Sequence, residues 1–176
     1  MRINKRYKYD IARINQSLNK SGSFNKKNKT IRSLFCTLIE RTRLYKNKVE
    51  SIQKKTFSKN KKLYERHIRD FVACTIAGKS KKFYSFGTSH NTLHLYHHEI
   101  KNLLESRLGV IGCASKKTGS PNIIGKCAEV KSANYILTMD KSCRLNELEF
   151  TPAIRPRTLE IISRCPNCVS IFGKEQ

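Results

Sequence analysis

Two short cysteine motifs constrain the fold of this chain more than any other feature. One is a Cys-Ala-Glu run that starts at Cys127, and the other is a Cys-Pro-Asn-Cys run from Cys165 to Cys168. Three thiolates can hold a tetrahedral Zn²⁺ and leave its fourth position open to water. For such a site to form, the fold must bring together two segments that are about 38 residues apart in the sequence.

Glu129 lies two residues after the first candidate ligand, Cys127. If a helix starts at this point, the Glu129 carboxyl group projects close to the metal without having to bind it. A carboxylate in that place can carry protons between a water at the metal and a substrate. Glu129 is therefore the candidate catalytic residue.

The two motifs together resemble the signature of the zinc-dependent cytidine and nucleic-acid deaminases, His-x-Glu or Cys-x-Glu followed by Pro-Cys-x-x-Cys. The Cys-Ala-Glu run is similar to that of the bacterial polymorphic-toxin deaminases of the YwqJ-like group. Between the motifs, residues 151–156 (Thr-Pro-Ala-Ile-Arg-Pro) look like the strand and arginine-proline segment of that group. The resemblance covers about residues 93–173. It departs at Arg164, because most of the superfamily has proline before the first cysteine of the pair.

The resemblance implies a fold class and a cofactor. The expected fold is α/β (α+β), a compact core similar to cytidine deaminase with a short central sheet and both zinc motifs at helix N-termini. The expected cofactor is Zn²⁺, held by Cys127, Cys165 and Cys168. Helix N-termini suit such ligands because their positive dipole ends favour thiolate over thiol.

The resemblance also implies three contacts to the substrate. The backbone N–H of Ala128 would hold the exocyclic oxygen of the base, and Asn122 would contact the sugar or the base. Ser163 would offer its backbone carbonyl to the leaving amino group. Asn122 is equally well explained as a turn residue that follows Pro121.

Positive charge is concentrated in the first half of the chain. Residues 1–82 hold 24 Lys and Arg against 5 Asp and Glu, whereas residues 83–176 hold 12 against 8. We therefore expect a basic, largely helical and partly disordered extension over 1–82 and a deaminase-like zinc domain over 83–176. Such a charge favours nucleic acid as a partner, and single strands are favoured because the base must be unstacked. A solvated basic tail is the alternative.

Hydrophobic periodicity predicts the order of elements along the chain. Helical spacing predicts helices over 31–45, 64–72 (ended by Gly78) and 93–104. It also predicts a helix after Cys127, with Ala133 and Leu137 inward, and a short helix after Cys165 that ends at Gly173. Strands are expected over 83–86, 110–114, 123–124 and 148–151. The last strand either ends at Pro152 or continues as an edge strand to Ile154. Residues 157–163 look helical or irregular. Residues 1–30 look flexible, and they carry Tyr7, Tyr9 and Phe24 as candidates for base stacking.

The remaining cysteines and the histidines leave alternatives open. Cys36, Cys74, Cys113 and Cys143 are isolated in the sequence and fit reduced thiols better than a disulfide framework. A redox dithiol and a structural zinc ribbon compete for the Cys-x-x-Cys motif. One predicted helix contains four histidines, His90, His94, His97 and His98. His94 and His98 have an i, i+4 spacing and could bind a second metal ion.

The sequence thus predicts a zinc-dependent hydrolytic deaminase of a nucleobase in nucleic acid, with cytosine the favoured base. In the context of the resemblance it would be a toxin or effector with an immunity protein as a partner. The alternatives are a non-catalytic nucleic-acid-binding protein with a structural zinc and a deaminase of free nucleosides or nucleotides. No signal peptide or membrane span is visible, so we expect a protein that is intracellular or delivered into a target cell.

Overall fold

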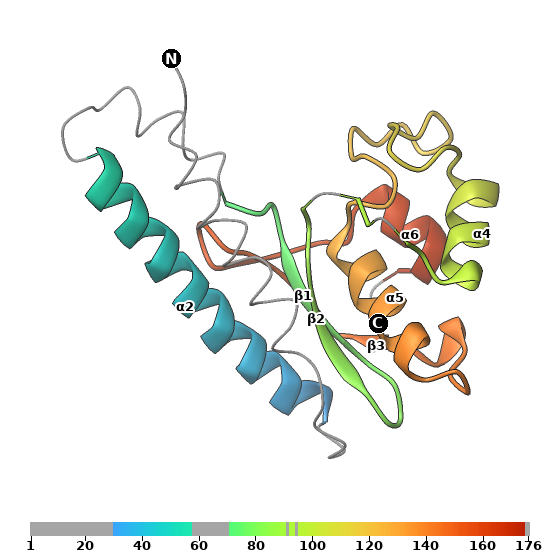
Figure 1. Cartoon of the computed structure of the whole chain (residues 1–176), viewed down its shortest axis with the longest axis horizontal. Coiled ribbons are helices and arrows are strands. Elements are labelled where there is room, and N and C mark those ends of the chain that lie inside the picture. Colours follow the sequence, from blue (N-terminus) through green and yellow to red (C-terminus); the bar gives the residue numbers. More distant parts are fainter. Residues whose placement is uncertain (1–29, 58–70, 91, 94, 175–176) are drawn as a thin grey trace.

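A small antiparallel sheet lies between one long helix and a group of shorter helices in the computed structural model (Figure 1). The structure describes residues 30–57, 71–90, 92–93 and 95–174. Helix α2 (Ile31–Phe57) packs against one face of the sheet, and helix α5 (Ala128–Met139) packs against the other. The described part of the chain is therefore of mixed α+β class, as the sequence predicted.

Strand β1 (Thr75–Lys79) is the centre of the sheet. It pairs antiparallel with β2 (Tyr84–Thr88) on one side and with β3 (Glu149–Phe150) and β4 (Ala153–Arg155) on the other. Strand β5 (Glu160–Ile162) then pairs antiparallel with β4, so that the order is β2-β1-β4-β5. The sheet joins segments of the chain that lie about 80 residues apart in the sequence, as the pairing of Thr75 with Ile154 illustrates.

The alternation of side chains along β1 explains how both faces of the sheet become covered. Ala77 is buried against Leu34 and Leu38 of α2, whereas the preceding residue, Ile76, is buried against Ala128 of α5. Successive residues of a strand point to opposite faces. A strand of small and apolar residues that is buried on both faces can therefore pack against α2 on one side and α5 on the other.

A glycine in β2 sets the distance between the sheet and α5. A Cβ atom added to Gly87 would overlap the backbone carbonyl of Ala128 in the first turn of α5. Glycine is the only residue without a Cβ atom, so only glycine at position 87 lets α5 lie directly on the backbone of β2. This contact also fixes the place of Cys127, which immediately precedes α5.

The main hydrophobic core lies on the α5 side of the sheet. Helices α4 (His98–Arg107) and α6 (Pro166–Phe172) pack beside α5 there, and a short 3₁₀ helix, η2 (Leu145–Glu147), borders them. Ala133 and Leu137 point inward, as the helical spacing predicted. The fully or nearly buried side chains of this core include Ile100, Leu104, Val130, Ala133, Ile136, Leu137 and Ile171.

Three predicted elements differ from the structure. The predicted strand over 110–114 is a turn region with a single β-bridge between Ala114 and Ile123. The predicted helix over 93–104 begins only at His98. Of the predicted helix over 64–72, residues 64–70 lie outside the described residues, and Phe71 and Val72 are not helical. Gly78, expected to end that helix, instead lies within β1, because pairing with two neighbouring strands outweighs a local helical pattern.

The segment before the second cysteine motif also differs from its prediction. Residues 157–163 were expected to be helical or irregular, but Glu160–Ile162 form strand β5. This strand is antiparallel to β4 and so does not belong to the parallel βαβ unit that a thioredoxin-like dithiol requires. The boundary predicted between residues 82 and 83 falls in the turn between β1 and β2.

Among the described residues, we find no helix with the length and apolar character needed to cross a membrane.

Candidate metal centre and adjoining pocket

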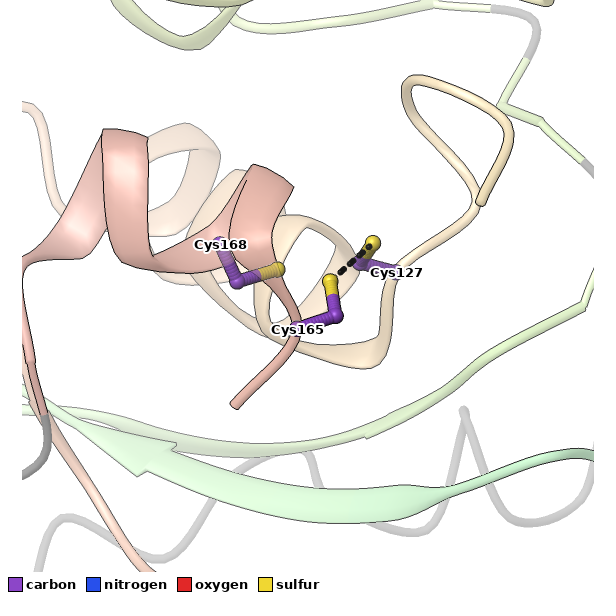
Figure 2. A group of neighbouring side chains, drawn as sticks. All are labelled: Cys127, Cys165 and Cys168. Atoms are coloured by element: carbon purple, nitrogen blue, oxygen red, sulfur yellow. Dashed lines mark hydrogen bonds between the residues drawn. The ribbon is translucent and has the colours of Figure 1, made fainter. Parts of the chain in front are cut away.

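The structure brings the two cysteine motifs together. The Sγ atoms of Cys127, Cys165 and Cys168 all lie within 4.8 Å of one another, and those of Cys127 and Cys165 are 3.6 Å apart (Figure 2). Cys127 and Cys168 are buried, and Cys165 is half-buried. Three sulfur atoms so close together form a group that could hold a metal ion, and the donor set is compatible with zinc.

Both motifs lie at helix N-termini, as predicted. Cys127 is the N-cap residue of α5 and Cys165 is the N-cap residue of α6, each with an extended backbone. Pro166 occupies the first turn of α6, where proline's fixed φ favours the start of a helix. Cys168 follows within the same turn, so that the α6 motif presents two thiols toward Cys127 (Figure 2).

The crowding of the three thiols points to a cation. Hydrogen bonds from Cys127 and Cys168 lower the pKa of Cys165, while sharing these same hydrogen bonds raises the pKa of Cys127 and of Cys168. Three thiols this close together cannot all lose their protons without a compensating positive charge. A bound cation would let all three act as thiolate ligands, and for this reason we consider that the residues present fit a metal ion.

Glu129 lies in the first turn of α5, beside the three cysteines. It is buried, with 3% of its surface exposed. Burial raises the pKa of its carboxyl group, a backbone hydrogen bond opposes this, and the nearby Cys165 raises it further. A buried carboxyl group whose affinity for protons is increased suits a group that must both accept and donate a proton.

Arg164 forms an ion pair with Glu129 that sequence reasoning missed. Its Nε atom lies 3.9 Å from Glu129 Oε1, and both side chains are more than 90% buried. Its Nη1 atom donates hydrogen bonds to the carbonyl oxygens of Gly173 at 2.8 Å and Phe172 at 3.5 Å. Its Nε–H has no hydrogen-bond acceptor among the described residues. Arg164 therefore links Glu129 to the end of α6.

A pocket of about 750 Å³ opens beside the cysteines and Glu129. Two of the predicted substrate contacts, Asn122 and Ser163, line its wall. The pocket is also lined by residues that precede β1 and by the turn between β4 and β5. Its lining comprises Phe71, Val72, Ala73, Cys74, Ser89, His90, Pro121, Asn122, Ile123, Lys126, Cys127, Glu129, Ala153, Arg155, Arg157, Ile162, Ser163 and Cys165.

Asn122 is held in place by α6. The Nδ2 atom of Asn167 donates a hydrogen bond of 2.9 Å to the Asn122 carbonyl, and the Oδ1 atom of Asn167 accepts one of 2.5 Å from Thr118. The Asn122 side chain in turn hydrogen-bonds to Cys165 and contributes to lowering the pKa of that thiol. Asn122 is therefore oriented toward both the cysteines and the pocket.

Ala128, the third predicted contact, is fully buried where the first turn of α5 packs against the sheet. Its backbone hydrogen-bonds to the side chain of Cys74, which lines the pocket. Burial and the Glu129 charge nevertheless raise the pKa of this thiol to about 12. A substrate oxygen would therefore compete with the Cys74 sulfur for the Ala128 N–H. The sequence around Cys74 does not predict its place in the site, because strand pairing across the sheet brings Cys74 there.

Among the described residues, the group that could hold a metal ion contains no histidine. His90 lines the pocket, His97 precedes α4 and His98 begins it, whereas His94 lies outside the described residues. The predicted pair of His94 and His98 is therefore not described. All seven cysteines are free. Tyr7, Tyr9 and Phe24, the candidates for base stacking, also lie outside the described residues.

Comparisons of the chain with protein-family models, with curated proteins and with solved structures returned no match. The resemblance to deaminases is therefore carried by the sequence motifs.

Proposed function

We propose that this protein is a zinc-dependent hydrolytic deaminase that acts on a nucleobase in single-stranded nucleic acid, with cytosine the favoured base. One observation carries the proposal: three converging thiols and a buried glutamate meet at the wall of one pocket. A structural zinc site needs neither the pocket nor a buried carboxylate beside it. The order of two helix-capping cysteine motifs on one side of a short sheet is also what the resemblance implies.

Cys127, Cys165 and Cys168 would hold the metal. When bound, Zn²⁺ supplies a Lewis acid that lowers the pKa of a coordinated water toward neutrality. Asn122 would orient the substrate from the pocket wall, and Ala128 would offer its N–H to the base oxygen in place of the Cys74 thiol. Closure of the site by α5 and α6 limits the access of bulk water to Glu129.

Glu129 would move the protons of the reaction. Its carboxylate accepts a proton from the attacking water and delivers it to the ring nitrogen next to the amino-bearing carbon. The water oxygen forms a bond to that carbon as a hydroxyl group. Glu129 then takes the remaining proton of this hydroxyl and gives it to the amino group, the bond from the carbon to the amino nitrogen breaks, and ammonia leaves. Water and cytosine are thereby converted to uracil and ammonia without any other reactant.

The charge of the pocket favours a phosphorylated substrate over a neutral nucleoside. Lys126, Arg155 and Arg157 line it, and Glu129 is the one carboxylate in its described lining. A role as a toxin or effector, and an immunity protein as a partner, belong to the same proposal and rest on the resemblance.

The test combines zinc content with turnover. Purified protein should hold about one zinc per chain, and Cys168→Ala should lose it, whereas Cys36→Ala on the exposed face of α2 should retain it. Glu129→Gln should keep the zinc but lose roughly 10²–10⁴-fold in deamination of a single-stranded oligonucleotide. The matched control is Glu105→Gln, an exposed glutamate on α4, which should retain both properties.

Near-normal turnover in Glu129→Gln would contradict the assigned role of this residue. Zinc without turnover on any oligonucleotide or nucleoside would favour a structural zinc in a nucleic-acid-binding protein. Turnover of cytidine at the same rate as an oligonucleotide, independent of salt, would favour a free-nucleoside deaminase.

A further inference from the structure

One wall of the pocket belongs to a loop that has little structure of its own. Residues 121–123 line the pocket, and residues 116–122 contain neither helix nor strand. The hydrogen bonds within this loop are long. The Asn122 N–H donates to Ser120 Oγ at 3.3 Å, and the Ser120 N–H donates to Thr118 Oγ1 at 3.4 Å. Bonds of this length are weaker than those at the usual distance of about 2.9–3.0 Å, so the loop needs support from another element to form a fixed wall.

Asn167 of α6 supplies this support. Its side chain is buried, with 1% of its surface exposed. Both ends of its amide bond to the loop: Nδ2 donates to the Asn122 carbonyl at 2.9 Å, and Oδ1 accepts from the Thr118 hydroxyl at 2.5 Å. Because the Asn122 carbonyl can only accept, its place opposite Nδ2 fixes the way the amide faces. One buried side chain thus holds the loop at two points, with shorter bonds than the loop makes within itself.

The turn of helix that holds the loop also carries two of the candidate metal ligands. Asn167 lies between Cys165 and Cys168 in the first turn of α6, and it is not part of the described pocket lining. Asn122, whose carbonyl it holds, lines the pocket, and the Asn122 side chain hydrogen-bonds to Cys165. The position of this pocket wall is therefore set from the same turn that presents the thiols, by a residue that has no direct access to a molecule in the pocket.

We propose that Asn167 is a positioning residue for the substrate. By holding the Asn122 peptide against α6, it directs the Asn122 side chain toward a nucleoside in the pocket and so increases the affinity for that nucleoside. This assignment rests on the proposed function in that it takes the pocket to bind a nucleoside. Asn167 acts only through the loop, and its two hydrogen bonds are not required for the three cysteines to bind the metal.

The test measures the affinity of the zinc-loaded, full-length protein for uridine. Uridine has no amino group to lose, so binding is read without turnover. Asn167→Leu keeps a side chain of similar size but removes both hydrogen bonds to the loop. Since one hydrogen bond typically contributes several-fold to an equilibrium constant, this variant should raise the Kd for uridine by about 10-fold. Its zinc content should remain about one per chain.

A matched pair of variants at Thr118 tests the other end of the same contact. Thr118 is half-buried in the loop and is not part of the described pocket lining. Thr118→Val keeps the shape of the side chain but cannot donate to Asn167 Oδ1, so the Kd for uridine should rise several-fold. Thr118→Ser retains the hydroxyl group and should bind uridine as the wild type does. An equal loss of affinity in both Thr118 variants would contradict a role for this hydrogen bond.

A double-mutant cycle with Asn122→Ala separates positioning from a general effect on the fold. If Asn167 acts through the Asn122 side chain, Asn167→Leu should weaken uridine binding no further once Asn122 is alanine. Independent, additive losses of affinity would overturn the proposal, because a merely structural role does not depend on the Asn122 side chain. If Asn167→Leu does not fold, the same cycle with Thr118→Val decides the outcome.

The remaining outcomes distinguish this inference from the proposed function. Loss of zinc in Asn167→Leu with unchanged affinity for uridine would show that Asn167 supports the metal ligands and would overturn its role toward the substrate. A wild-type protein that does not bind uridine would contradict the nucleoside pocket itself, and the inference with it. Coupled losses in a protein that binds uridine but does not deaminate cytosine would support the role of Asn167 and contradict only the chemistry.

Discussion

Arg164 is the residue that connects the candidate chemistry to the stability of the fold. Its guanidinium group lies between Glu129, the ring of Phe150 at 5.6 Å and the last carbonyls of α6. A buried arginine in such a place supplies the counter-charge for Glu129 and satisfies the C-terminal carbonyl groups of a helix at the same time. Its removal would leave the buried Glu129 carboxylate without the positive charge of its ion-pair partner.

We therefore expect Arg164→Leu to destabilise the protein strongly. Removing one partner of a buried ion pair typically costs about 3 kcal/mol or more, which corresponds to roughly 6–12 °C in Tm for a chain of this length. The measurement is thermal unfolding of the zinc-loaded protein at neutral pH.

The control for this variant is Arg107→Leu. Arg107 also donates a hydrogen bond to an α6 carbonyl, that of Ser170 at 2.6 Å, but it is exposed and has no carboxylate partner among the described residues. Its removal should cost about 1 kcal/mol or less. Equal, small decreases in stability in the two variants would show that the pair between Arg164 and Glu129 contributes little.

At the scale of elements, the contact of α5 with β2 positions the first metal ligand. Gly87 and Gly78 both face α5, and a Cβ on either would come too close to Ala128 or Ser132. The same contact is tightened by Ser85, whose hydroxyl donates to the Ser132 carbonyl at 2.9 Å. The helix that begins after Cys127 therefore packs closely against the backbone of β1 and β2.

Gly87→Ala should accordingly move α5 away from the sheet and weaken the metal site. Overpacking of this kind typically costs about 1–3 kcal/mol. Because Cys127 caps α5 while the other two cysteines belong to α6, a shift of α5 alone separates the thiols. The expected result is lower stability together with a lower affinity for zinc, measured by competition with a chelator.

Gly119→Ala provides the comparison. Gly119 has a φ of +64° and open space around its Cα, so alanine there costs about 1 kcal/mol of backbone strain without displacing an element. Its zinc affinity should match that of the wild type. A Gly87→Ala protein that binds zinc as tightly as Gly119→Ala would mean that α5 tolerates the shift.

At the scale of the whole molecule, positive charge and core packing divide the chain differently. The first 82 residues carry most of the net charge, yet α2 and β1 within them are part of the sheet and its covering layer. The distribution of charge alone would suggest removing residues 1–80 as a separate basic extension. That deletion would remove β1, the central strand of the sheet. Residues 1–29, by contrast, hold nine Lys and Arg against one Asp and lie before α2.

We expect deletion of residues 1–29 to weaken binding of a single-stranded oligonucleotide and to flatten its dependence on salt. For each phosphate that the shortened protein no longer neutralises, the slope of log affinity against log salt should become about 0.7 less steep. Zinc content and the rate on cytidine should be unchanged, since the cysteines and the pocket lie within residues 71–168. An unchanged salt slope would show that the nucleic-acid contacts lie outside residues 1–29. Deletion of residues 1–80 should instead abolish folding, because it removes β1.

The sequence alone was sufficient to predict the features that depend on short spacings. The helices that begin after Cys127 and Cys165, the end of α6 at Gly173, the inward face of α5 and the strand near Phe86 are confirmed. The gathering of three thiols into a group that could hold a metal is also confirmed. These features follow from the capping, periodicity and ligand chemistry of neighbouring residues, which a linear pattern contains.

Only the tertiary structure decided the rest of the site. Strands β1 and β5 were missed because each is short and is stabilised by pairing with distant segments. The ion pair of Arg164 with Glu129 and the hydrogen bond of Cys74 with Ala128 likewise join residues that are far apart in the sequence. Strand pairing and the burial of charge are non-local: their free energy depends on which surfaces meet, and no short window of the sequence contains both partners.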